Sequence, residues 1–467
     1  METMRKAKVG LLGLMLEAYD ASFPQLRPYA EGFARELVGV ISDFADVSFP
    51  GICNTRELVD SAVAGFEGEG ADLIVVVLLT YAPSLIALAA LRRTRLPIVI
   101  LNTQRAKGVR QDSPGALLIE NHGMHGVQDL ANVLLRADRP FDIVTGHWQD
   151  ERVLGALRSW CSAARAIAAL RQCRIGLVGY AMQDMGDFAL DEAALLAQLG
   201  AQVRRMPQRA IAERASQAPQ DALERMMSED RTRFEVDPAL SEPEHRASVR
   251  LEWALRSVCD ELGLAGLAAH FMAIDEEKQL ETLPFLAASK MLGDGYAFGG
   301  EGDVTSAVAV YLMRQLAGEA NFTEMFTMDF EGSAIMMAHM GEGNWRMARK
   351  DRKVRLVRNP FSMVKLAYSP ASLSFALEPG PVTLVSLTTG PDGRLRFIAC
   401  EGEVVDFPPL EGTLNPQYKF APCGRLEDFL TDFSMAGGSH HQALAYGSHC
   451  DTLRKLAGLL GLDCFVV

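Results

Sequence analysis

The chain has 467 residues and a formal net charge of −13, with 49% hydrophobic and 22% charged residues. This length predicts two or three domains, and the composition is typical of a globular protein without extended disorder. The acidic balance argues against the concentrated basic face that nucleic acid or an anionic membrane would need, so we expect a small-molecule partner.

The N-terminus and the cysteines both indicate a cytoplasmic protein. Basic residues precede the apolar run VGLLGLML, but acidic residues follow it at once and no cleavage site is present. We therefore predict a first β-strand there rather than a signal peptide. The longest apolar run, at 73–79, is too short to cross a bilayer. The eight cysteines are scattered without a CxxC pair, which is typical of reduced thiols.

The first third of the chain alternates buried strands with helices. Three runs rich in leucine and β-branched residues predict parallel strands covered on both faces, at 8–16, 71–80 and 97–103. Helical spacing lies between them at 56–70 and 83–94, and a long Ala- and Arg-rich helix at 151–171 ends this part. The pattern predicts a doubly wound α/β domain of the flavodoxin or Rossmann-like type.

A second α/β unit of the same kind is predicted from about residue 173, where a strand, a polar loop and a helix follow one another. Residues 203–258 are charged and helical in pattern, with prolines as breakers, and are predicted to form surface helices. From about 353 the pattern changes to antiparallel strands, with GPDGR (390–394) as a hairpin turn and a closing helix at 450–461. We expect three domains: an N-terminal α/β domain (1–171), a central α/β domain (172–316) and a C-terminal, mainly antiparallel β domain with helices (317–467).

Four residues late in the chain are of the types that bind a hard divalent metal. They are Glu301 in GGEGD, Glu324 in FTEMF, His339 in MAHMG and His441 in AGGSHHQA. Carboxylate oxygens and neutral imidazole nitrogens suit Mn²⁺, Co²⁺, Fe²⁺ or Mg²⁺, whereas a soft metal would favour thiolates. Taken singly, each has a plainer explanation, such as a turn glutamate, a core histidine or a helix cap.

These segments resemble those of the L-arabinose isomerase family, within the wider L-arabinose and L-fucose isomerase group. GYAFGGEGDVTSAV (295–308), FTEMFTMDFE (322–331), AGGSHHQA (436–443) and GHWQD (146–150) carry the resemblance, in the family's order. LNTQ (101–104) and LEPGPVTLVSL (377–387) add weaker matches, so the resemblance spans nearly the whole chain.

The resemblance implies a manganese-dependent aldose–ketose isomerase of three domains, assembled as a trimer or a pair of trimers with active sites at subunit interfaces. Its metal ligands would be Glu301, Glu324, His339 and His441, with His440 as the second choice to His441. One ion per site is implied, with Co²⁺, Mg²⁺ or Fe²⁺ as substitutes for Mn²⁺. Between Glu324 and His339 the chain is about two residues shorter than is usual in the family.

Such an enzyme moves a hydrogen between C1 and C2 of a sugar through a cis-enediol. A metal stabilises the enediolate, and a carboxylate takes and returns the proton. We predict that Glu301 and Glu324 divide these roles, with Glu301 favoured as the general base. A hydride shift is the chemical alternative, but it would need two metals.

Further residues are predicted to contact the sugar. Within the resemblance, NHGMHG (121–126) reaches into a neighbouring subunit's site and places His125 there, while Met182 corresponds to a pocket methionine that packing explains equally well. The chain departs from the family at Met15, Glu17 and His122, where glutamines or a Ser-Gln context are usual. Because unpaired buried polar groups penalise the wrong sugar, these departures leave the substrate open among L-arabinose, D-galactose, an L-fucose-like sugar and a modified sugar.

Two other classes of protein remain as alternatives. One is a non-catalytic sugar-binding protein on a periplasmic-type α/β scaffold, which would not need four metal ligands. The other is a metal-dependent lyase or aldolase that uses the same enediolate chemistry. A nicotinamide dehydrogenase is disfavoured, because GLLGLM after the first strand contains no GxGxxG.

Overall fold

The computed structural model describes residues 4–467, and the chain divides into two compact units, with the boundary between Ala168 and Ala169. No helix in this part of the chain is long and apolar enough to cross a membrane. The division of residues 172–467 into a central and a C-terminal domain stays a prediction.

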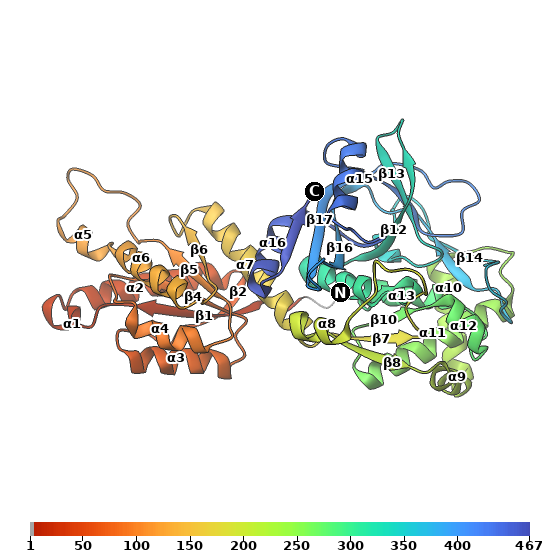
Figure 1. Ribbon diagram of the computed structural model, residues 1–467, viewed down its shortest axis with the longest axis horizontal. Helices are drawn as coiled ribbons and strands as arrows, with labels where there is room; N and C mark the ends of the chain where they lie inside the picture. The colour runs from red at the N-terminus through yellow and green to blue at the C-terminus, as the bar shows by residue number, and fades with distance from the viewer. Residues whose placement is uncertain (1–3) are drawn as a thin grey trace. The chain divides into compact units, whose positions relative to one another are not determined.

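The first unit is built on a parallel sheet, as its leucine- and valine-rich runs predict (Figure 1). The strand order is β2-β1-β4-β5-β6, and the two-residue strand β3 (Ile52–Cys53) also pairs with β1. The other strands are β1 (Ala7–Leu14), β2 (Ala45–Ser48), β4 (Leu73–Leu78), β5 (Ile98–Asn102) and β6 (Asp142–Thr145). The helices are α1 (Tyr19–Ser22), α2 (Leu26–Ser42), α3 (Arg56–Gly68), α4 (Leu85–Arg93), α5 (Ala116–Glu120), α6 (Gly123–Arg136) and α7 (Glu151–Leu170).

Helices cover the first sheet because its strands are apolar on both faces. Every residue of β4 is buried, as expected of a parallel strand between two layers. Side chains of α3, α4 and α6 form one core with alternate residues of β1 and β4. A side chain at Gly10 of β1 would lie 2.4 Å from the ring of Phe66 on α3, so glycine permits this close packing.

The second unit begins with a smaller parallel sheet in the order β11-β10-β7-β8. Its strands are β7 (Arg174–Val178), β8 (Gln202–Met206), β10 (Gly266–Ala269) and β11 (Ala297–Gly299). Its helices are α8 (Glu192–Leu199), α9 (Gln208–Ser216), α10 (Gln220–Arg233), α11 (Glu242–Leu262), α12 (Phe271–Glu277), α13 (Phe285–Gly293) and α14 (Val304–Ala317). Both parallel sheets thus agree with the predicted α/β class.

The prediction of surface helices over 203–258 is wrong at two places. Gln202–Met206 is the edge strand β8, whose exposed arginines hide the strand pattern. The helix α11 buries nine of its residues, including His245 and Glu252. Those polar groups are satisfied internally, since His245 Nε2 lies 3.0 Å from Asp230 and Lys290 Nζ lies 2.7 Å from Glu252.

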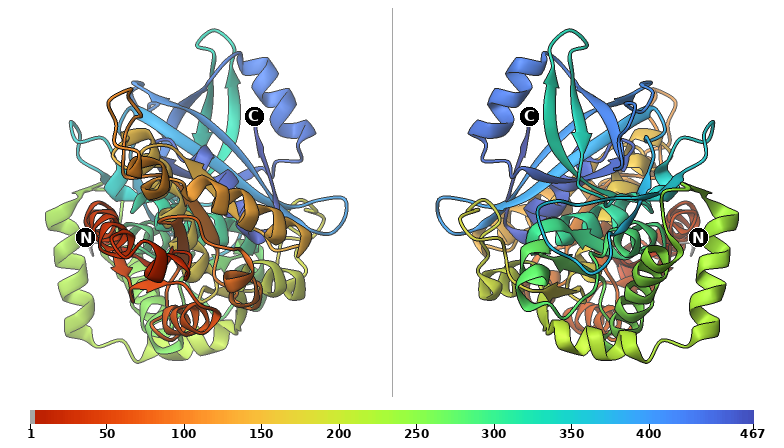
Figure 2. Two further views of the ribbon diagram at one scale, coloured as in Figure 1. Left: turned by 90° about the vertical axis from the view of Figure 1, so that its left-hand side faces the viewer. Right: turned by 90° about the vertical axis from the view of Figure 1, so that its right-hand side faces the viewer.

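The rest of the second unit contains a seven-stranded, mainly antiparallel sheet in the order β16-β19-β12-β13-β18-β17-β20. The additional pairing of β16 with β17 closes six of these strands into a ring. The seven strands of the sheet are β12 (Asn321–Asp329), β13 (Ala334–Ala338), β16 (Gly380–Thr389), β17 (Leu395–Val405), β18 (Gln417–Pro422), β19 (His441–Tyr446) and β20 (Asp463–Val466), and β20 lies outside the ring. Figure 2 shows the projecting hairpin that the antiparallel strands β12 and β13 form.

The predicted hairpin turn and the predicted closing helix are both present in this region. The predicted turn joins β16 to β17, and Gly390 N donates a hydrogen bond to Arg394 O at 2.7 Å. The predicted closing helix is α16 (Cys450–Leu460), but the chain continues into β20, which pairs parallel to β17. A small sheet of β9 (Glu235–Val236), β14 (Arg355–Arg358) and β15 (Ala371–Ser374), and the helix α15 (Leu426–Met435), complete the unit.

Candidate metal centre

Three of the predicted ligands come from adjacent strands of the antiparallel sheet. β12 pairs with β19 on one side and β13 on the other, and in this register Glu324 stands opposite both His441 and Ala338. His339 follows Ala338 at the end of β13. Because directly opposite residues of antiparallel strands lie close together, the pairing gathers one carboxylate and two imidazoles.

The fourth residue, Glu301, lies at the carboxyl end of the parallel strand β11, in a tight turn before α14. Its backbone is left-handed, with φ of 56°, a conformation that non-glycine residues seldom adopt. The flanking glycines have no room for side chains: a Cβ at Gly300 would lie 2.6 Å from the His339 ring, and one at Gly302 would lie 2.2 Å from Tyr180 O. The GGEGD motif therefore brings the backbone close to the ligands and presents Glu301 to them.

The predicted ligands form two overlapping sets that share His441. The donor atoms of Glu324, His339 and His441 all lie within 4.8 Å of one another, and so do those of Glu301, His440 and His441. Glu301 Oε2 is 3.5 Å from His440 Nε2 and 3.8 Å from His441 Nε2. His440, the second choice on sequence grounds, thus stands as close to Glu301 as His441 does.

Nδ1 of each imidazole in the cluster lies within hydrogen-bond distance of a carboxylate. His441 Nδ1 lies 3.1 Å from Asp303, His339 Nδ1 lies 2.6 Å from Glu342, and His440 Nδ1 lies 2.6 Å from Asp187. Asp303 is fully buried and also caps α14, where it accepts a hydrogen bond from Ser306 N at 2.9 Å. A carboxylate on Nδ1 turns Nε2 toward the opposite side, which is the arrangement found behind metal-bound histidines.

The atoms that face the centre of the cluster have no hydrogen-bond partner within residues 4–467, and their nearest polar neighbours are one another. Glu301 Oε2, His440 Nε2 and His441 Nε2 are buried, and none of the described residues accepts or donates a hydrogen bond to them. Buried polar atoms are rarely left unpaired, so three that converge on one point are typical of a ligand-binding site. Mixed carboxylate and imidazole donors fit a divalent ion such as Mn²⁺ or Co²⁺.

The electrostatics of the cluster keep Glu301 ionised. Burial acts to raise the pKa of Glu301, but the neighbouring histidines outweigh it and hold the pKa below its usual value. Burial likewise opposes charge on His440, yet the hydrogen bond to Asp187 and the nearby Glu301 raise its pKa to about 10. For His339, burial is outweighed by Glu342, and the pKa is raised.

The cluster is buried on one side and accessible on the other. The side chains of His441 and His339 are 0% and 4% exposed, whereas those of Glu301 and His440 are 17% and 31% exposed. The backbone of Met182 lies next to that of Glu301, since its N–H donates to Glu301 O at 2.9 Å. A small-molecule substrate therefore reaches Glu301 and His440 more easily than the two deeper histidines.

The other predicted sugar contacts lie in the first unit. His122 is half-buried between Ile119 O, 2.8 Å from Nδ1, and the Tyr19 hydroxyl, 3.0 Å from Nε2. The ring of His125 is 5.7 Å from that of His122. Met15 is fully buried, and Glu17 is exposed. The structure thus brings His122 and His125 together, and the role of all four in binding sugar stays a prediction.

Sequence reasoning missed the carboxylates that hold the histidines. Glu342 stands three residues after His339 and Asp303 two residues after Glu301, so local spacing could have drawn attention to both. Asp187 carries no such signal, because its partner His440 is distant in the chain. Phe188, which stacks on His441 with ring centroids 5.7 Å apart, was missed for the same reason.

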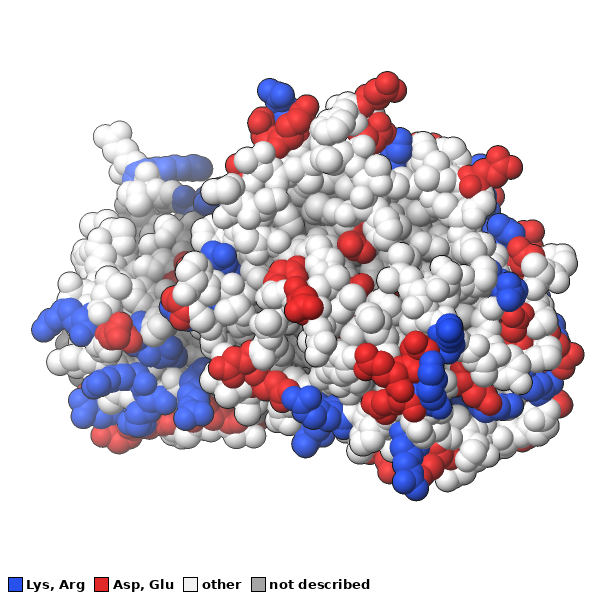
Figure 3. All heavy atoms as spheres, turned by 45° about the vertical axis from the view of Figure 1, so that its right-hand side comes forward, with Lys and Arg blue, Asp and Glu red and all other residues white. Residues whose placement is uncertain are grey.

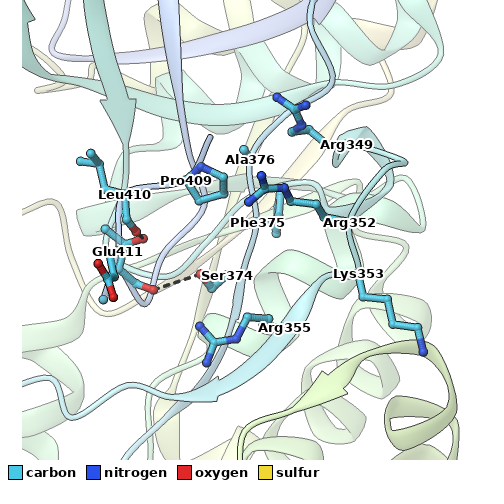
Figure 4. A pocket seen from close by; sticks show the side chains of 12 residues that line it. Arg349, Arg352, Lys353, Arg355, Ser374, Phe375, Ala376, Pro409, Leu410 and Glu411 are labelled. Carbon is cyan, nitrogen blue, oxygen red and sulfur yellow. Dashed lines mark hydrogen bonds between the residues drawn. The ribbon is translucent and has the colours of Figure 1, made fainter. Parts of the chain in front are cut away.

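A separate cavity of about 250 Å³ is lined by Arg349, Arg352, Lys353 and Arg355 (Figure 4). Its positive charge is offset, because Arg349 pairs with Asp351 and Asp406, Arg355 pairs with Asp237, and Glu411 also lines the wall. Figure 3 shows the same mixing of acidic and basic side chains over the face of the second unit that it presents. This cavity is therefore not a strong anion site.

Three family models and several named relatives match this chain. Models of the L-arabinose isomerase N-terminal, central and C-terminal domains match residues 44–172, 178–319 and 319–463. L-arabinose isomerase 1 of Bacillus licheniformis is 25% identical over 88% of this chain and 83% of its own length. The L-arabinose isomerase of Anoxybacillus flavithermus is 24% identical over 94% and 89%, and that of Thermotoga maritima is 26% identical over 84% and 80%.

Among solved structures, a periplasmic solute-binding protein of Actinobacillus succinogenes with bound D-allose covers 59% of this chain and 84% of its own, at 11% identity and a TM-score of 0.17. A TM-score this low carries no argument about fold or function. The domain matches and the named relatives instead set aside the sugar-binding and lyase alternatives. The chain belongs to the L-arabinose isomerase family, and it is an aldose–ketose isomerase.

Proposed function

We propose that this isomerase acts on a free aldose with a divalent ion held by Glu301, Glu324, His339 and His441. The observation that carries the proposal is the convergence of unpartnered donor atoms from β19 and the β11–α14 turn beside Glu324 of β12. When bound, Mn²⁺ or a similar ion polarises the sugar oxygens at C1 and C2 and so acidifies the neighbouring C–H.

Glu301 is the proposed general base. Its lowered pKa keeps it ionised near neutral pH, and its side chain is more exposed than those of His339 and His441. It takes a proton from one carbon of the sugar and returns it to the other through a cis-enediol. Glu324 assists proton movement between the two oxygens.

The proposed substrate is L-arabinose or a related aldose. The relatives are named for L-arabinose, but Met15, Glu17 and His122 replace the amide side chains that are usual in the family. A site with a different set of hydrogen-bonding groups favours a different pattern of hydroxyls, because each mismatch leaves a buried polar group unpaired. Met182 and His440, which lie beside Glu301, would complete the sugar's surroundings.

We further propose a cytoplasmic homo-oligomer, a trimer or hexamer, in which His125 of one subunit contacts the sugar bound at another subunit's metal centre. The proposal rests on the resemblance of NHGMHG to a family segment. It is consistent with the position of Met124 and His125, which are exposed on the first turn of α6 and so available to a neighbour.

An assay with a panel of sugars tests the function. Enzyme treated with a chelator is expected to be inactive and to regain isomerisation with Mn²⁺, because the sugar's C–H is otherwise too weak an acid. L-Arabinose, D-galactose and L-fucose are tested, and the ketose product is measured. Full activity in the chelated enzyme would contradict metal dependence. Turnover of L-arabinose far above every other sugar would contradict the altered specificity.

Replacing either glutamate by glutamine tests the division of roles. E301Q and E324Q are each expected to lower kcat about 10²–10⁴-fold, because a neutral amide can neither accept the proton nor balance the ion's charge. The circular dichroism spectrum and melting temperature check that the fold is intact. E331Q, at an exposed position in the β12–β13 turn, is the matched control and is expected to behave as wild type. Wild-type turnover by either active-site variant would refute the mechanism.

Mixing two variants that each lack one proposed site residue tests the shared site. H125A and E324Q lie in different units, so a mixed oligomer has sites with both residues intact only if neighbouring subunits share them. Random 1:1 assembly in a cyclic oligomer is expected to restore about a quarter of the wild-type sites. H122A mixed with H125A is the control, because both changes lie in the same unit and no complete site can form. Failure of H125A and E324Q to complement each other would place the whole site in one chain.

A further inference from the structure

Asp187 contacts Ser439 and His440 of the segment Ser439–His441, although no sequence motif predicts this pairing. It lies in the irregular segment between β7 and α8, and its Oδ2 accepts hydrogen bonds from Ser439 Oγ at 3.1 Å and His440 N at 3.0 Å. The same oxygen lies 2.6 Å from His440 Nδ1. One carboxylate oxygen thus fixes both the backbone and the ring of His440.

The ring that Asp187 holds faces the reaction centre. With Nδ1 bound to Asp187, His440 Nε2 points toward Glu301 Oε2, 3.5 Å away, and has no hydrogen-bond partner among the described residues. Free rotation of the ring would otherwise exchange these two nitrogens. Asp187 therefore determines which nitrogen of His440 the proposed base and its sugar meet.

The segment around Asp187 is itself held against the strand ring. Phe188 is buried and its ring lies 5.7 Å from the rings of both His440 and His441. Thr388 Oγ1, at the end of β16, donates to Asp187 O at 3.4 Å. The aspartate is thus fixed before any ligand arrives, which lets it orient His440 at little entropic cost.

We propose that Asp187 is a positioning residue of the isomerase, acting through His440. It holds His440 Nε2 beside Glu301, where the imidazole contacts the sugar or its exchanging proton. The inference rests on the proposed function, since it assigns a partner to the same site. Asp187 has no contact with the sugar in this account.

A double-mutant cycle tests the proposal. D187A is expected to lower kcat about 10–100-fold, the usual effect of losing a carboxylate behind an active-site histidine. D187N keeps an oxygen acceptor and is expected to recover most of that loss. In an H440A background, D187A is expected to cost nothing further, because the residue through which it acts is gone. D184N, an exposed aspartate of the same segment whose left-handed backbone suits asparagine, is the control.

Two outcomes would overturn the proposal. If D187A lowers kcat by the same factor with and without His440, Asp187 supports the loop and not the histidine. If D187A has wild-type kcat and KM, the contact has no role in catalysis. Asp187→Leu, which also lacks the acceptor, replaces D187A in both arms if the alanine variant does not fold.

A crystal structure of D187A without ion or sugar separates this inference from the proposed function. The His440 ring is expected to turn or shift, so that Nε2 no longer lies 3.5 Å from Glu301 Oε2. An unmoved ring would overturn the inference even if the enzyme isomerises sugars. Conversely, failure of the wild-type enzyme to isomerise any sugar would defeat the proposed function and leave this structural result standing.

Discussion

The register of β12 against its two neighbours is the constraint on which the site depends. It sets Glu324 opposite His441 on β19 and opposite Ala338 on β13, and His339 follows Ala338 directly. A slip of one residue would turn Glu324 to the opposite face of the sheet. The shift in pairing between Met325 and Thr327 follows immediately, so the ladder is regular where the ligands are and irregular beyond them.

Asp303 links the parallel sheet of the second unit to the ring of six strands. That one buried carboxylate caps α14, just after the turn that presents Glu301, and also holds His441 Nδ1 on β19. A change in the position of the turn would therefore move a histidine as well as a glutamate. Phe322, whose ring lies 4.8 Å from that of His339 and 4.9 Å from that of His441, fills the space behind both imidazoles.

Much of the fold could be predicted from the sequence because its signals are local, and the four proposed ligands could be predicted because their short segments resemble those of a family in the same order. The runs around Leu73–Leu78 are apolar at every position, and GGEGD combines an acidic residue with glycines that a left-handed turn requires. Strand β8 was missed because it is an edge strand with exposed arginines, and its helical neighbours dominate the pattern. The carboxylates behind the histidines could not be predicted with equal ease, since Asp187 and His440 meet only through tertiary packing. Clustering of Glu301 with His440 also depends on the fold, not on spacing.

The central claim is that one divalent ion occupies the space between the histidines of the strand ring and the glutamate turn. Anomalous diffraction from crystals soaked in Mn²⁺ tests it most directly, because the signal locates the ion independently of any assay. The account predicts a single strong peak within coordination distance of His339, His441 and Glu324, with Glu301 at the same ion. A peak elsewhere in the chain, or none at this cluster when the crystals contain Mn²⁺, would contradict it.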